Sequence, residues 1–119
     1  MTFRDIIEAM HKRDSAVTSG AIVGSDGLTV EEWRAPGDSQ DLFALCAETA
    51  QFFRESARIA LENGLGEGRE AFFSGDKGCV FIHRVNEGYS LAVVASNKVI
   101  PGRCRFLLRQ AVLRAREIL

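Results

Sequence analysis

Histidine and cysteine side chains are the first candidates for chemistry in this sequence, and their spacing argues against a catalytic role. His11 and His83 lie far apart, and no pair of histidines or cysteines has the short spacing of a metal site. Cys79 and Cys104 belong to no local arrangement of nucleophile, base and orienting group. With Cys46 they form an odd, widely spaced set, so we expect reduced core residues rather than disulfides. The sequence predicts no catalytic centre, no metal and no other cofactor.

Three glycines, Gly64, Gly66 and Gly68, resemble a phosphate-binding loop only in composition. Such a loop follows a strand, opens a helix and carries a lysine and a hydroxyl residue. Here the segment leaves a predicted helix and enters a predicted strand, with Glu67 inside it and Glu70 after it. We therefore expect a connector, and no binding of a nucleoside triphosphate by the chain alone.

Arginines are concentrated near the C-terminus, at Arg103, Arg105, Arg109, Arg114 and Arg116. Such a cluster is able to bind phosphate or an acidic partner, but it more often solubilises an exposed helix and pairs with carboxylates. The net charge of -1, from 15 basic and 16 acidic residues, argues against a general nucleic-acid binder, and aromatic interleaving is missing from this surface. We expect Phe106 and Leu113, which stand among these arginines, to pack on the first helix.

Hydrophobic periodicity predicts the elements that would position these side chains. Their expected order is a helix capped by Thr2 and ending near Asp14, strands at 16–23 and 28–33, a long helix capped by Asp38 or Ser39 and ending near Asn63, strands at 70–74, 79–85 and 89–95, and a helix from Pro101 to Leu119. The length of 119 residues, 46% of them hydrophobic, suits one domain spanning 1–119. The economical architecture is an α/β sandwich, with one five-stranded antiparallel sheet and helices on its faces.

The first fourteen residues carry a charge every few positions and contain no apolar run. They predict neither a signal peptide nor a membrane span. We accordingly expect a cytoplasmic protein that does not bind membranes.

The long middle helix has more apolar surface than one sheet requires. Its apolar and small residues spread over roughly 200° of the helix, whereas a helix on one sheet needs about 100°. They include Leu42, Leu45, Cys46, Thr49, Phe52 and Phe53. The surplus is explained either by loops of the same chain or, as we favour, by self-association, for which a two-fold dimer is the commonest outcome.

The narrow polar side of this helix carries Glu48, Gln51, Arg54, Glu55 and Arg58. These residues have two interpretations. They are either a solvated face with weak pairs between successive turns, or a docking surface of mixed charge that a dimer would present twice.

Several segments resemble the Roadblock/dynein-light-chain family. They are Gly20 to Val23 followed by Ser25 to Leu28, the strand Tyr89 to Ala95, and the helix that starts near Pro101-Gly102 and continues through Arg105 to Leu113. Each motif is mostly hydrophobic pattern plus glycine, but together they cover nearly the whole chain.

The resemblance implies a sheet with strand order 2-1-5-4-3, helices 1 and 3 on one face and the long helix 2 on the other. Family members form homodimers or heterodimers by pairing their third strands and packing their middle helices. For this chain the implied strand contacts are Ala71, Phe72 and Phe73. Together with the middle-helix residues, they form the predicted dimer interface.

The family includes motor-associated light chains and regulators of small Ras-like GTPases, and the prokaryotic members are similar to the latter. The resemblance thus implies a non-enzymatic dimeric regulator or scaffold that binds a small Ras-like GTPase, with stimulation of GTP hydrolysis left open. Arg54 and Arg58 are the candidates for contact, although no motif identifies an inserted catalytic arginine. The alternative is a structural light-chain-like subunit. A small enzyme or ligand sensor is a third hypothesis, but we expect no cavity lined by convergent polar groups.

Overall fold

The computed structural model describes residues 1–119 and places five antiparallel strands in one sheet. The strands are β1 (Val17–Gly24), β2 (Thr29–Arg34), β3 (Glu70–Ser74), β4 (Gly78–Arg84) and β5 (Tyr89–Ser96). Their order in the sheet is β2-β1-β5-β4-β3, which confirms the expected order. β2 and β3 are therefore the two edge strands, each with one side of its backbone unpaired.

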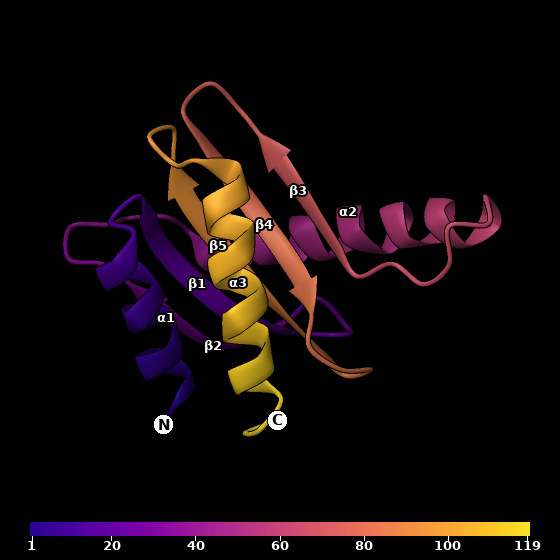
Figure 1. Cartoon of the computed structure of the whole chain (residues 1–119), viewed down its shortest axis with the longest axis horizontal. Coiled ribbons are helices and arrows are strands. Elements are labelled where there is room, and N and C mark those ends of the chain that lie inside the picture. The colour runs from indigo at the N-terminus through magenta and orange to yellow at the C-terminus, as the bar shows by residue number, and fades with distance from the viewer.

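Three helices cover the two faces of this sheet: α1 (Phe3–Arg13), α2 (Leu42–Glu62) and α3 (Pro101–Ala115). α1 and α3 lie side by side on one face, and α2 crosses the other face (Figure 1). This arrangement confirms the predicted α/β sandwich. None of the three helices is long and apolar enough to cross a membrane.

The two faces of the sheet bury cores of very different size. The core under α1 and α3 contains 19 buried residues, whereas the core under α2 contains seven. Successive side chains of β1 point to opposite faces of the sheet, so this strand contributes to both cores. Ile22 points into the larger core, and Ala21 and Val23 point into the smaller one. The α2 face is thus the less completely covered side of the molecule.

Most element boundaries agree with the sequence pattern, but two differ. α2 is capped by Asp41, whose side chain accepts the N–H of Ala44 at 3.2 Å, and not by the expected Asp38 or Ser39. Asp38 instead accepts the N–H of Gln40 at 3.4 Å and stabilises a turn before the helix. α3 ends at Ala115 rather than Leu119, because Glu117 and Ile118 donate to carbonyls three residues back and interrupt the α-helical pattern.

The exposed face of α3 corrects another expectation. Phe106 and Leu113 are 54% and 60% exposed, and therefore do not pack on α1. Leu107 and Ala111, on the neighbouring helix face, line the boundary with α1 instead. All three cysteines are buried and free, which confirms that they act as small core residues.

Candidate functional site

The middle helix α2 has one part that covers the sheet and one part that extends beyond it. Cys46, Ala50 and Phe53 pack in the smaller core, whereas Leu61, near the C-terminal end, is 68% exposed. Figure 1 shows the C-terminal part of α2 continuing past the edge strand β3. Part of the surplus apolar surface predicted from the sequence is therefore left uncovered by the protomer itself.

The predicted interface residues on α2 fall into two groups. Four of them are buried against the sheet of their own protomer: Leu42, Cys46, Thr49 and Phe53. We correct these four to core residues, because they face the sheet and have almost no surface left for a partner. Leu45 is half-buried and Phe52 is 39% exposed, so these two keep surface that another chain could contact.

A narrow stripe along α2 continues from these two residues. Leu45, Phe52 and Ile59 are spaced seven residues apart, which places them nearly in line on the helix. Between Phe52 and Ile59 stands the smaller, half-buried Ser56, which allows a second helix to approach closely. Ile59 is 49% exposed and was missed as an interface residue, although the spacing was present in the sequence.

The edge strand β3 presents a phenylalanine on each face of the sheet. Phe73 is 62% exposed, and its ring meets that of Phe52 edge-on with centroids 6.3 Å apart. Phe72 stacks on Phe81 of β4 at 5.2 Å, on the side of α3. Ala71 packs against the smaller core. The structure thus brings Phe73 together with the α2 stripe and separates Phe72 from it.

Hydrogen bonds determine which backbone groups of β3 are free. The N–H of Gly75 donates to the carbonyl of Gly78 at 2.8 Å, so the odd-numbered residues of this strand pair with β4. In an antiparallel ladder the alternate residues point their backbone groups the other way. Glu70, Phe72 and Ser74 therefore direct their N–H and C=O groups away from the sheet, where another strand can pair with them.

An open groove lies beside α2 on the same face of the sheet. Its volume is about 490 Å³, and its apolar lining includes Leu45, Phe73, Val80 and Val94. The β3–β4 turn and the segment before α2 form its ends, through Gly75 and Gln40 among others. This groove joins the α2 stripe to the free edge of β3.

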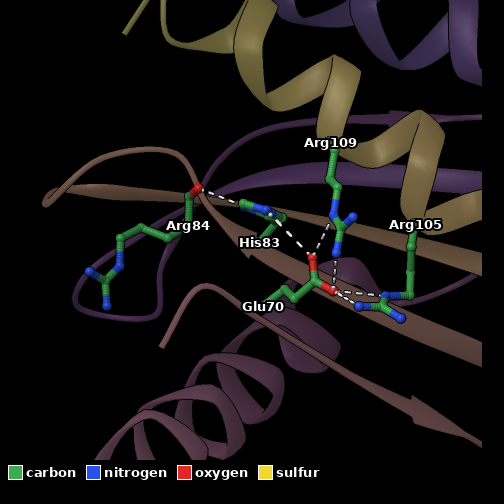
Figure 2. A network of polar contacts seen from close by, with 5 residues as sticks. All are labelled: Glu70, His83, Arg84, Arg105 and Arg109. Carbon is green, nitrogen blue, oxygen red and sulfur yellow. Dashed lines mark hydrogen bonds and ion pairs between the residues drawn. The ribbon is translucent and has the colours of Figure 1, made fainter. Parts of the chain in front are cut away.

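The first residue of β3 is held by a network of charged side chains (Figure 2). Arg105 and Arg109 of α3 both donate to the carboxylate of Glu70, the Nε of Arg105 at 2.7 Å. His83 of β4 approaches the same carboxylate, with Nε2 at 3.6 Å from Oε2. Burial opposes ionisation of Glu70, but the two arginines outweigh it and hold its pKa below the usual value. The start of the edge strand is thereby attached to α3.

The predicted partner-binding residues of α2 are all exposed: Glu48, Gln51, Arg54, Glu55 and Arg58. Arg58 forms ion pairs with Glu55 and Glu62, and the contact with Glu55 raises the pKa of Arg58 while lowering that of Glu55. Arg54 makes a single contact, from Nη1 to the carbonyl of Ser25 at 3.4 Å. Arg54 is consequently the freer of the two arginines.

The histidines and cysteines first considered for chemistry have structural contacts in this fold. His11 and His83 each use Nδ1 on a backbone carbonyl, at 2.7 and 2.8 Å. Burial raises the pKa of the Cys46 thiol and raises that of Cys104 to about 12, which disfavours the thiolate a nucleophile requires. No three His, Cys, Asp or Glu side chains are grouped to hold a metal ion.

A polar cleft corrects the expectation that no cavity has a polar lining. It has a volume of about 700 Å³ and lies between the segment before β3, the end of β4 and the end of α3. Its lining includes Arg69, Arg84, Arg116, His83 and Glu67. No local pattern indicates this cleft, because these residues come from three segments that only the fold brings together.

Comparison with known proteins finds similar structures but no similar sequence. No family model matches the sequence. No curated protein matches it either. Among solved structures, the Roadblock/LC7 domain from Streptomyces avermitilis has a TM-score of 0.85 with 17% identity, covering 97% of this chain and 95% of that one.

The chain has the Roadblock/LC7 fold. The gliding protein MglB from Thermus thermophilus gives a TM-score of 0.87 at 14% identity, over 98% of this chain and 87% of that chain. Myxococcus xanthus MglB gives 0.82 at 19% identity, over 98% and 93% of the two chains. These likenesses confirm the predicted resemblance at the level of the fold.

Proposed function

We propose that this chain is a non-enzymatic regulator or scaffold that works as a homodimer and binds a small Ras-like GTPase, whose GTP hydrolysis it stimulates. The observation that carries the proposal is the continuous unpartnered surface formed by the α2 stripe, the groove beside it and the free edge of β3. A protomer that leaves these three features exposed is suited to pair with a second copy.

The geometry of the dimer follows from the position of α2. If two β3 strands pair antiparallel about a two-fold axis, the two sheets become one. The part of α2 that extends past β3 then lies over the sheet of the partner, beside the partner's own α2. Phe52, Ile59 and Phe73 would be buried by this packing, and the partner helix would occupy the groove lined by Val80 and Val94.

The polar side of α2 is the surface we assign to the GTPase. Two-fold pairing would place two copies of it near one another, on the side of the molecule opposite α1 and α3. Stimulation would require the regulator to reorient catalytic groups of the GTPase or to donate an arginine. Of the two predicted contact arginines, Arg54 is the better candidate, since Arg58 is already paired with two carboxylates.

The test uses a small Ras-like GTPase encoded next to this protein and measures its GTP hydrolysis with and without the full chain. We expect hydrolysis to be accelerated, and we expect Arg54→Ala to reduce the acceleration more than Arg58→Ala does. The two variants remove the same charge from exposed positions of one helix, so a difference between them reports the contact rather than the lost charge.

Two outcomes would contradict the proposal in different ways. Binding with unchanged hydrolysis would favour a scaffold or a structural light-chain-like subunit. No binding to the GTPase by a chain that still forms dimers would exclude the GTPase as a partner and leave only the self-association.

A further inference from the structure

The polar cleft at the start of β3 borders the proposed dimer edge, but its arginine side chains have no part in the proposed dimer or in the surface assigned to the GTPase. Three arginines line it, Arg69, Arg84 and Arg116. Glu70 also lines it, but its charge is already balanced by Arg105 and Arg109. The cleft therefore has an excess of positive charge, although the whole chain carries a net charge of -1.

Two of the three cleft arginines, Arg84 and Arg116, are held by contacts within the chain, and all three still have donors to offer. Arg116 donates its Nε to the carbonyl of Val85 at 2.8 Å, which leaves its terminal nitrogens free. The side chain of Arg84 points away from the Glu70 network (Figure 2) and pairs with Glu67. Arg69 forms no ion pair. A guanidinium group fixed on a backbone carbonyl, as that of Arg116 is, loses little conformational entropy when it binds an oxyanion.

The glycine-containing segment from Gly66 to Arg69 also lines this cleft. Four consecutive N–H groups, from Gly66 to Arg69, donate to no acceptor of the chain. Gly66 has φ +84, a conformation that favours glycine. Gly68 lies so close to Ala57 that an added Cβ would be 2.7 Å from the Cβ of Ala57. Consecutive free N–H groups in a glycine-containing turn are a recurring way of binding anions.

We propose that this cleft binds a compact phosphate-bearing ligand, with Arg69, Arg84 and Arg116 as its charged donors and the Gly66–Arg69 backbone as its neutral ones. The only aromatic ring in the lining is the imidazole of His83, which is 9% exposed and directs its two nitrogens to the Arg84 carbonyl and to Glu70, so it offers little surface for stacking a base. The only apolar lining residues are Ala60 and Leu65. Its ligand is therefore a phosphate compound without a nucleobase. This proposal requires neither the dimer nor the GTPase.

Glu67 has a defined part in the binding. Its side chain is 78% exposed, while that of Arg84 is only 30% exposed, so the carboxylate is the mobile member of the pair. A phosphate oxygen would replace this carboxylate on Arg84. Removing the carboxylate charge should consequently tighten binding, which a purely structural ion pair would not predict.

The test is isothermal titration calorimetry of the full chain with pyrophosphate. We expect Arg84→Gln and Arg69→Gln each to weaken binding about tenfold, and Glu67→Gln to strengthen it several-fold. Lys98→Gln is the matched control, because Lys98 is exposed, forms no ion pair and lies outside the cleft. Amide resonances of Gly66 and Gly68 should shift on titration, which checks the site even if one variant folds poorly.

Three results would overturn the proposal. One is the absence of binding at millimolar pyrophosphate. Another is an equal loss of affinity for Lys98→Gln and Arg84→Gln, which would indicate attraction to the overall charge. The third is equal binding of citrate and pyrophosphate, which would show that the cleft does not select phosphate over carboxylate.

Discussion

The two edge strands of the sheet differ in how many charged residues they carry and in how regularly they pair with their neighbour. β2 places Glu31, Glu32 and Arg34 among its six residues, and its pairing with β1 contains an irregularity between Ile22 and Val23. Charged side chains and bulges are the devices by which proteins keep an edge from pairing. β3 pairs with β4 in unbroken register and carries a single charged residue, Glu70, at its start.

The charges on the two strands are also used differently. On β2, Arg34 pairs with Glu32 within the strand at 3.2 Å, so both charges remain along the edge. On β3, Glu70 is neutralised by Arg105 and Arg109 of α3, which leaves the edge without a free charge. We infer that β2 is protected against association, and that β3 is kept available for it.

The proposed difference between the two edge strands is tested by placing a charge on each of them in turn. Phe73 on β3 and Val30 on β2 are matched in exposure, at 62% and 59%. We expect Phe73→Asp to weaken the dimer about a hundredfold, because it would bury a charge at the centre of the interface. Val30→Asp should leave the dimer unchanged. Sedimentation equilibrium of both variants measures the two dissociation constants.

A smaller effect on the dimer is expected from substitutions on two sides of α2. Phe52 lies on the stripe with Leu45 and Ile59, whereas Phe43 lies on another side of the helix and is 61% exposed. We expect Phe52→Ser to weaken the dimer about tenfold through lost apolar burial, and Phe43→Ser to have little effect. Light scattering over a dilution series compares them, and equal effects would contradict the assigned packing of α2.

The smallest effect concerns the attachment of β3 to α3. Glu70→Gln should lower the free energy of unfolding by about 1 to 2 kcal/mol at neutral pH. The pKa of Glu70 is lowered in the folded state from a usual value of 4.5, so its contribution is complete above that value and is lost as the pH falls through the folded pKa. Denaturant unfolding as a function of pH should show the wild type and variant converging in acid.

The control for this last experiment is Glu87→Gln. Glu87 is exposed and forms no ion pair, so its replacement should leave stability unchanged at every pH. A difference between wild type and Glu70→Gln that persists in acid would mean that the side chain contributes by packing rather than by charge.

Much of the fold was predictable because its signals are local. The period of the apolar residues, the glycine-containing turns and Pro101 indicated the order and type of every element. The surplus apolar surface of α2 was also visible in the sequence, as residues such as Phe52 and Ile59 have no place on a helix that only covers a sheet. The boundary errors at Asp41 and Ala115 arose where several residues could cap or end a helix equally well.

The candidate site was less predictable, since it depends on contacts between distant residues. Nothing in the sequence distinguishes Phe53, which is buried, from Phe52, which is exposed, until the sheet shows which side of α2 it covers. Glu70 and its two arginines are 35 and 39 residues apart. The polar cleft likewise combines three segments, so no local motif could have revealed it.

The central claim, that β3 is the edge through which two copies associate, is tested most directly by amide hydrogen exchange at increasing protein concentration. We predict that the amides of Phe72 and Ser74, which point away from β4, become protected as the concentration rises through the dissociation constant. The amides of β2 should exchange at the same rate throughout. Exchange at Phe72 and Ser74 that does not depend on concentration, or protection that rises on β2 instead, would contradict the claim.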